Sequence, residues 1–312
     1  MQCYANAQFI TLLGFDRPSS SAKIAAVSDP RAPHPPSPPS ARAEPREIVE
    51  LKRLKQDQPD LAGAADLQIE LLQIQRRIQA RVPLPSIRLE AEYLSGLLTN
   101  GPILQFEHLP VDWTDLRFML RATATAMRNH EALEDTDHRK AEDLSRQAER
   151  LPGIVRTWYE SPRPGSAPLS PEAEGIETVI QQAMRPFLTR SSEAVMARTD
   201  LGTWNRGSCP LCGGEPDLAV ITAAADRLLI CGRCAARWRF ESLTCPFCLN
   251  GDRKRITSFA SRDGQYRLYA CDVCERYVKA YDARRASRPV MPVVDGVATL
   301  PLDAAAIQKG YR

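Results

Sequence analysis

Eight of the nine cysteines of this 312-residue chain lie between positions 209 and 274, in four Cys-x-x-Cys pairs. The pairs are Cys209/Cys212, Cys231/Cys234, Cys245/Cys248 and Cys271/Cys274. Two cysteines three residues apart in a tight turn direct both sulfurs to one point, and two such turns facing each other make a tetrahedral thiolate site. The eight thiols therefore predict two metal ions, each in a four-cysteine site. All four histidines lie outside this segment, so we expect sulfur to be the only ligand atom.

Other uses of these cysteines fit the chain less well. Structural disulfides need an oxidising compartment. The apolar stretch from Ala7 to Phe15 has neither the basic flank nor the small-x-small cleavage site of a secretory signal, so we expect a cytoplasmic protein. A thioredoxin-like redox pair normally occurs once, beside a βαβ pattern. The four-pair repeat of J-domain co-chaperones is evenly spaced, whereas these intervals are uneven and only Gly213-Gly214 matches its glycines.

The segments between the pairs predict which pairs share a metal. Residues 218–222 and 227–230 are apolar and flank the short turn 224–226, and residues 256–261 and 266–270 flank Asp263-Gly264. Both patterns are typical of β-hairpins. Each hairpin brings together the cysteine pairs at its two ends. We therefore expect the first pair to face the second and the third to face the fourth, with an interleaved arrangement, first facing third, as the alternative.

Residues close to the cysteines fit metal binding. Pro210 and Pro246 follow the first cysteine of their pairs and fix φ there, and Gly213 allows the positive φ of a turn that directs backbone amides to sulfur. Five aromatic residues lie near the ligands: Trp238, Phe240, Phe247, Tyr269 and Tyr277. We expect them to pack the cores of two small ribbons; shielding of a redox metal is the alternative. Four thiolates suit structural zinc or a single iron of rubredoxin type, and the spacing does not choose between them.

The preceding part of the chain has a helical pattern. Apolar residues recur every three or four positions in three stretches, which predicts amphipathic helices. The stretches are Leu61, Ala64, Leu67, Leu71, Ile74 and Ile78; Leu116, Leu120, Ala124 and Met127; and Ile176, Val179, Ile180, Ala183 and Phe187. Ser170-Pro171 resembles a helix start. Breaks at Pro83-Leu84-Pro85, Gly101-Pro102 and 161–168 predict six to eight helices.

The fold class expected is therefore α+β and multidomain: an N-terminal α-helical domain followed by two tandem rubredoxin-like or zinc-ribbon metal domains with four cysteines each. The boundaries are a Pro-rich disordered segment at 1–45, the helical domain at 46–200, a first metal ribbon at 201–240, and a second ribbon with the C-terminal tail at 241–312. No apolar run approaches the roughly 20 residues of a membrane span, so we expect no membrane contact.

Charge and motifs limit the functions to consider. The net charge is +3. Residues 226–288 hold 14 Lys and Arg against seven acids, but four thiolates around a divalent ion carry about −2 per site and offset about half of that surplus. No nucleophile elbow, Walker loop or dinucleotide motif is present. Paired acids such as Glu131/Glu134 and Glu172/Glu174 fit solvated helix faces, and His108, His130 and His138 stand alone. We expect a protein without catalytic activity.

The chain resembles the formate dehydrogenase accessory (formation) protein family, whose members carry tandem rubredoxin-like Cys-x-x-Cys pairs. The matching motifs are the sequences Cys-Pro-Leu-Cys-Gly at 209–213, Cys-Gly-Arg-Cys at 231–234 followed by Trp238, Cys-Pro-Phe-Cys at 245–248, and residues 271–279. Residues 295–303, the final Gly-Tyr-Arg and the stretch 60–85 are similar as well. The Pro-rich first 45 residues depart from the family pattern.

The resemblance implies an assembly factor that contacts the catalytic molybdopterin-containing subunit of a respiratory formate dehydrogenase in the cytoplasm before export. It implies iron in the four-cysteine sites, whereas the ligand set alone also suits zinc. The sequence is compatible with a homo-oligomer. The alternative function is a double zinc ribbon that binds nucleic acid, favoured by the ribbons and by Arg253-Lys254-Arg255.

Overall fold

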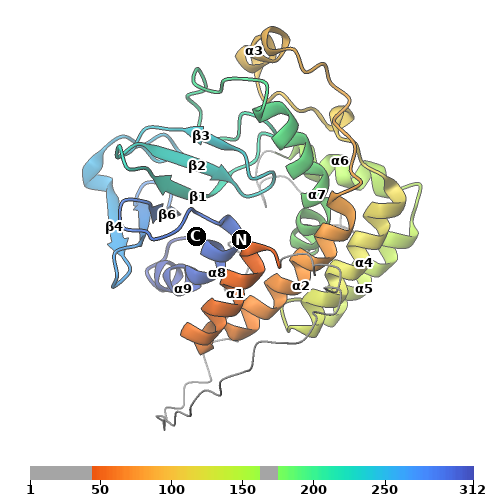
Figure 1. Ribbon diagram of the computed structural model, residues 1–312, viewed down its shortest axis with the longest axis horizontal. Helices are drawn as coiled ribbons and strands as arrows, with labels where there is room; N and C mark the ends of the chain where they lie inside the picture. Colours follow the sequence, from red (N-terminus) through yellow and green to blue (C-terminus); the bar gives the residue numbers. More distant parts are fainter. Residues whose placement is uncertain (1–43, 162–174) are drawn as a thin grey trace, which may run out of the picture.

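The computed structural model describes residues 44–161 and 175–312, in which a layer of helices packs beside a six-stranded sheet (Figure 1). The helices come first along the chain and the strands follow, as expected. In the part of the helical layer that is described there are seven α-helices: α1 Arg46–Asp57, α2 Ala62–Gln79, α3 Ala91–Asn100, α4 Trp113–Asn129, α5 Asp135–Arg146, α6 Leu151–Glu160 and α7 Glu177–Met196. Short 3-10 turns occur at η3 Pro59–Leu61 and η4 Phe106–His108.

The apolar stripes predicted from sequence form the interior of the helical layer. Leu67 and Leu71 of α2, Leu116 and Leu120 of α4, and Phe187 of α7 are all buried in one core. Asp112 caps α4 by accepting a hydrogen bond from the Asp115 amide at 2.9 Å, and the predicted breaks at 83–85 and 101–102 separate helices. The predicted helix start at Ser170-Pro171 and the Pro-rich segment up to residue 43 lie outside the described residues.

The strands form one continuous sheet in the order β3-β2-β1-β6-β5-β4. Their bounds are β1 Pro216–Ile221, β2 Arg227–Cys231, β3 Arg237–Arg239, β4 Ile256–Ala260, β5 Tyr266–Cys271 and β6 Arg276–Asp282, with the 3-10 turn η5 Arg253–Arg255 before β4. The two predicted hairpins are β1–β2 and β4–β5, each antiparallel. Parallel pairing of β1 with β6, with Leu218 opposite Lys279, joins the two ribbons edge to edge.

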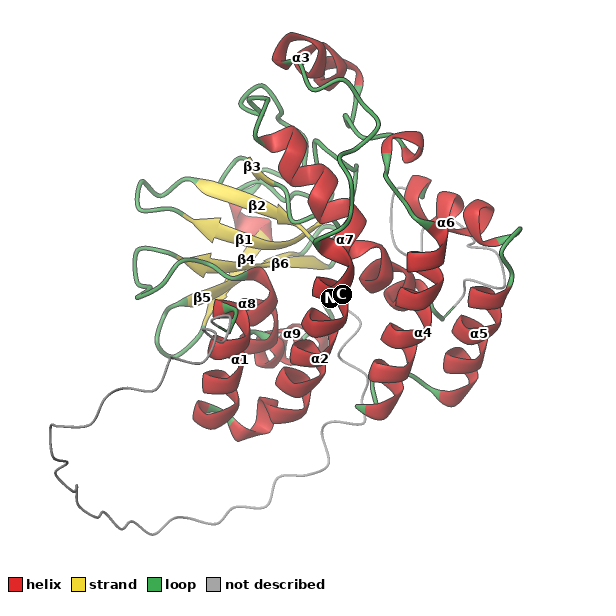
Figure 2. Ribbon diagram, turned by 45° about the vertical axis from the view of Figure 1, so that its right-hand side comes forward, coloured by secondary structure: helices red, strands yellow, loops and turns green. Residues whose placement is uncertain are grey.

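The C-terminal tail returns to the helical layer. Helices α8 Pro292–Ala298 and α9 Leu300–Gln308 follow the sheet, and α8 packs against α1 and α2. Figure 2 shows α1, α8 and α9 gathered on one side of the sheet. Ala298, Leu302 and Ala306 of α8 and α9 pack against side chains of β1, β2, β5 and β6, so these two helices cover a face of the sheet. Buried carboxylates of the tail bond to the sheet, since Asp295 accepts from the Tyr266 hydroxyl at 2.7 Å. Helix α1, near the start of the described residues, and helix α8, near the C-terminus, therefore pack against each other.

None of the helices in the described ranges is both long and apolar enough to cross a membrane.

Candidate metal centres

The eight cysteines converge into two groups of four, and the pairing is the one expected from the hairpins. The first group joins Cys209 and Cys212 to Cys231 and Cys234, and the second joins Cys245 and Cys248 to Cys271 and Cys274. Within each group all four sulfurs lie within 4.8 Å of one another. The interleaved alternative is therefore wrong.

The spacing of the sulfurs fits a tetrahedral ion. At a metal–sulfur distance of about 2.3 Å, two ligands of a tetrahedron lie about 3.8 Å apart. The Cys209–Cys234 and Cys212–Cys231 sulfur distances are 3.6 and 3.5 Å. In the second group, the Cys245–Cys274 and Cys248–Cys271 distances are 3.7 and 3.6 Å. These distances far exceed the 2.0–2.1 Å of a disulfide, and all eight cysteines are free. Each group could hold a metal ion.

All four Cys-x-x-Cys turns share one backbone geometry. The residue after the second cysteine has a positive φ in every turn: Gly213 (72°), Ala235 (60°), Leu249 (61°) and Glu275 (58°). Its amide donates to the carbonyl of the first cysteine, at 3.0 Å for Gly213 and 2.8 Å for Glu275. This tight turn points both sulfurs of a pair the same way. The sequence indicated the turn only at Gly213, because the other three positions carry residues that seldom adopt positive φ.

Backbone amides also reach the sulfurs of the first group. The amide of Leu211 lies 3.4 Å from the Cys209 sulfur, and the amide of Arg233 lies 3.4 Å from the Cys231 sulfur. Burial raises the pKa of the Cys209 and Cys234 thiols. Burial acts in the same direction on Cys231, but hydrogen bonds from the other three thiols outweigh it and lower the pKa of that thiol. In a buried cluster of this kind one thiol loses its proton more readily than the others. The remaining thiols ionise readily only when a bound cation balances their negative charge.

The second group is more open to solvent. Cys248 is exposed and Cys274 half-buried, whereas Cys245 and Cys271 are buried. Burial raises the pKa of Cys245 to about 11. Hydrogen bonds from the amides of Cys274 and Val273 and from neighbouring thiols outweigh burial at Cys271 and lower the pKa of its thiol.

Arg233 connects the first group to the helical layer, a role that the sequence did not predict. Its guanidinium is buried and donates to the carbonyls of Tyr159 at 3.0 Å and of Trp158 and Ser161 at 3.3 Å. These carbonyls lie at the C-terminal end of α6, where a helix leaves acceptors unsatisfied. The same guanidinium lies 4.7 Å from the centre of the Trp158 ring. A cysteine turn and a helix end are thus joined by one side chain.

The predicted aromatic residues pack around the groups. Trp238, Phe240 and Tyr277 are buried, and Phe247 and Tyr269 are half-buried against the main core. Trp238 donates to the Arg206 carbonyl at 3.1 Å. Core packing therefore accounts for these residues, as expected. His108 accepts from the Gln105 amide, His130 pairs with Glu70, and His138 is buried in α5. None of these three histidines belongs to either group of potential metal ligands.

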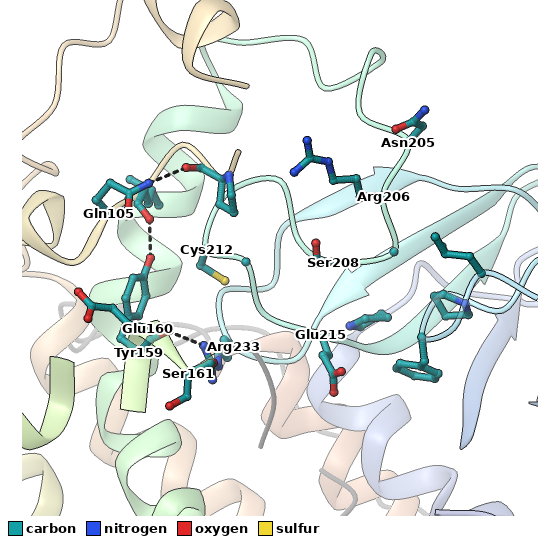
Figure 3. A pocket seen from close by; sticks show the side chains of 18 residues that line it. Gln105, Tyr159, Glu160, Ser161, Asn205, Arg206, Ser208, Cys212, Glu215 and Arg233 are labelled. Carbon is teal, nitrogen blue, oxygen red and sulfur yellow. Dashed lines mark hydrogen bonds between the residues drawn. The ribbon is translucent and has the colours of Figure 1, made fainter. Parts of the chain in front are cut away.

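A cleft of about 860 Å³ lies between the two cysteine groups. Its walls include Cys212 of the first group and Pro246 and Phe247, which belong to a turn of the second. Figure 3 shows Tyr159, Ser161 and Arg233 to one side of Cys212 and Arg206 to the other. The two carboxylates that line the cleft are both in ion pairs: Glu215 with Arg276, and Glu160 with Arg156.

Comparisons with known proteins agree with this architecture. No family model matches the chain. It is 28% identical over 113 residues to the "Protein FdhE homolog" of Aquifex aeolicus, covering 35% of this chain and 40% of the relative. It is 28% identical over 118 residues to the "Protein FdhE" of Escherichia coli K12, covering 37% and 38%. Each match spans less than half the length of the curated relative.

A solved structure extends the likeness over most of the chain. The crystal structure of the FdhE protein from Pseudomonas aeruginosa matches with a TM-score of 0.59 and 20% identity, and the match covers 86% of this chain and 92% of that one. At this identity the likeness shows the fold. Together, the named relatives and the shared fold confirm the resemblance to the formate dehydrogenase accessory protein family that the cysteine motifs indicated.

Proposed function

We propose that this protein is an accessory factor in the assembly of a respiratory formate dehydrogenase. It contacts the catalytic molybdoenzyme subunit in the cytoplasm before that subunit is exported, and it catalyses no reaction itself. The observation that carries the proposal is the pair of four-thiol groups at one end of a single sheet, in a fold shared with an FdhE protein.

Each thiol group is proposed to hold one metal ion. Cys209, Cys212, Cys231 and Cys234 supply the ligands of the first, and Cys245, Cys248, Cys271 and Cys274 those of the second. A bound zinc ion contributes folding energy, and a bound iron ion adds one-electron redox chemistry. The chain's part is to hold the sulfurs in place and to keep water away from the buried group.

The positions of the basic residues count against the nucleic-acid alternative. Nine of the 14 cations at 226–288 are engaged within the protein, six in ion pairs and three with backbone carbonyls. These are Arg239, Arg267, Arg276, Lys279, Arg284 and Arg288, and then Arg227, Arg233 and Arg255. Phosphate binding needs cations that are free to meet it. A salt titration against single-stranded DNA and RNA tests this, and we expect no steep dependence of affinity on salt.

The experiment that tests the proposed function is genetic and biochemical. In a strain lacking this gene, formate dehydrogenase activity should fall and return when the intact gene is supplied. A variant with Cys245 and Cys248 both changed to Ser should fail to restore it, because the second ribbon then loses its metal. Affinity-tagged protein should also co-purify with the catalytic subunit lacking its cofactor. Full activity with this pair of cysteines removed would falsify the proposal.

Metal identity follows from the same preparation. Anaerobically purified protein should contain two metal ions per chain. Ferric thiolate sites absorb in the visible region, whereas zinc sites do not, so a spectrum together with elemental analysis identifies the ion.

A further inference from the structure

The two cysteine groups differ in what covers them. The four cysteines of the first group are at most 5% exposed, and they belong to the main hydrophobic core that the helices and the sheet share. In the second group Cys248 is exposed, and its neighbour Leu249 is 62% exposed. Val273, between the last two ligands, is 53% exposed. A competing ligand can therefore reach the second group directly from solvent, whereas in the first group only Cys212, at 5% exposure, borders the cleft.

The groups also differ in what holds their turns. In the first, the Pro210 and Leu211 carbonyls accept from the amides of Ile103 and Leu104 at 3.0 and 2.8 Å. The Gly232 carbonyl accepts from the Gln181 side chain of α7 at 3.2 Å, and Arg233 binds the end of α6. Both turns of the first group are thus hydrogen-bonded to the helical layer.

The second turn of the second group, which holds Cys271 and Cys274, is held by the sheet and the C-terminal tail instead. The Tyr311 hydroxyl donates to Asp272 at 2.7 Å, and the Arg255 guanidinium donates to the Asp272 carbonyl at 2.9 Å. The Arg312 amide donates to the Glu275 carbonyl at 2.7 Å. Displacement of Cys248 from a metal would leave all these contacts, and the whole helical layer, in place.

From this contrast we infer that the second group is an exchangeable metal site and the first a permanent joint between the helices and the sheet. The second group takes up and releases a thiolate-preferring ion, zinc or ferrous iron, while the protein stays folded. Release frees the ion and leaves thiols or thiolates, with no change of oxidation state. This property goes beyond the proposed accessory function, because it makes one of the two centres responsive to metal supply.

Zinc release from the full-length protein tests the inference. Protein with zinc in both groups is mixed with excess 4-(2-pyridylazo)resorcinol, a coloured chelator, and release is followed by absorbance. We expect two phases of one ion each, differing in rate by at least about tenfold, since local opening is far easier at exposed sites than in a core. The far-ultraviolet circular dichroism should stay unchanged through the fast phase.

Variants assign the phases. C248S should abolish the fast phase and leave the slow one. R233M keeps all eight thiols but removes the contacts with α6, so it should speed the slow phase and leave the fast phase unchanged; K254M, an exposed change beside the second group, is the matched control. Release of both ions in one phase, a fast phase that persists in C248S, or a slow phase unmoved by R233M would each overturn the inference. None of these readouts depends on formate dehydrogenase, so the proposed function is tested separately.

Discussion

Glu215 and Arg276 form a bidentate ion pair, with nitrogen–oxygen distances of 2.8 and 2.6 Å, that bridges the two cysteine groups. Glu215 lies three residues after Cys212, and Arg276 lies two residues after Cys274. The Arg276 guanidinium also stacks 3.8 Å from the centre of the Phe247 ring, which belongs to the opposite turn of the second group. Both side chains are more than four-fifths buried. One guanidinium therefore fixes the position of one centre relative to the other.

A double-mutant cycle measures this bridge. We expect Arg276→Met to lower the free energy of unfolding of the zinc-loaded protein by about 2 kcal/mol, because a largely buried carboxylate loses its charged partner. Glu215→Gln should cost about 1–2 kcal/mol, and the coupling energy from urea unfolding of the single and double variants should be about 1 kcal/mol. The exposed pair Arg239–Asp226 is the control, with an expected coupling below about 0.5 kcal/mol. A coupling at Glu215–Arg276 no larger than the control contradicts the bridge.

A second contact between the groups depends on a glycine. A Cβ placed on Gly207 would lie 1.8 Å from the backbone carbonyl oxygen of Pro246. Gly207→Ala therefore forces the loop before the first group away from a turn of the second, at an expected cost of about 2–4 kcal/mol. Gly96, in α3, has no atom within 4 Å of its Cβ position, so Gly96→Ala should instead stabilise by about 0.5–1 kcal/mol. Thermal unfolding of both variants tests whether the melting temperature falls for Gly207→Ala and rises for Gly96→Ala. An unchanged melting temperature for Gly207→Ala would refute the close approach.

The parts of the fold that sequence predicts are those set by local pattern. The stripe at Leu67, Leu71 and Ile74 has helical spacing, and Asp263-Gly264 is a turn signal between two apolar runs, so both elements form where expected. The ligand groups follow from the same logic, because each hairpin fixes which cysteine pairs meet.

The parts that sequence does not predict depend on contacts between distant segments. The parallel pairing of β1 with β6, in which Leu218 lies opposite Lys279, cannot be read from the local sequence. Each ribbon would show the same alternation of apolar and polar residues whether or not it paired with the other. Arg233 lies between two ligands and could equally have been a solvated cation; only the position of α6 shows that it binds Tyr159. The positive φ of Glu275 is likewise imposed by the turn and not by the residue.

That positive φ predicts a stabilising substitution. Glu275 is exposed and has φ 58°, a conformation that costs a non-glycine residue roughly 1 kcal/mol. Glu275→Gly should therefore raise the stability of the zinc-loaded protein by about 0.5–1 kcal/mol. Gly213→Ala, at the equivalent position of the first turn, should lower it by at least that amount, because its Cβ would also meet Pro102 at 3.3 Å. Urea unfolding compares the two, and destabilisation by Glu275→Gly would contradict the shared turn geometry.

A buried ion pair holds the C-terminal helix on the sheet. The Lys279 ammonium lies 2.7 Å from the Asp303 carboxylate, both side chains are 3% exposed, and the Tyr277 hydroxyl donates to the same carboxylate at 2.8 Å. Lys279→Met should cost about 3–5 kcal/mol at neutral pH, because it leaves a buried carboxylate uncompensated.

Adding Asp303→Asn should recover most of that loss, since the neutral amide still accepts from Tyr277. Lys52→Met, in an exposed pair with Glu44, should change stability by no more than about 0.5 kcal/mol. Equilibrium unfolding of the three variants distinguishes a buried charge from a general effect of losing a lysine; equal losses for Lys279→Met and Lys52→Met would contradict the interpretation.

The lowered pKa of Asp282 predicts how the free energy of unfolding depends on pH. Hydrogen bonds from the Arg284 side chain, at 2.7 and 2.8 Å, outweigh burial and lower the pKa of Asp282 to about 2. Between about pH 5 and pH 2 the unfolded chain therefore binds more protons than the native protein, so the stabilisation is complete above about pH 5 and is lost as pH falls toward 2. Asp282→Asn should be less stable than the parent by up to about 2 kcal/mol at pH 6. The difference should shrink toward pH 2, as measured by urea unfolding at a series of pH values. A difference that stays constant across this range would show that Asp282 does not titrate with the lowered pKa.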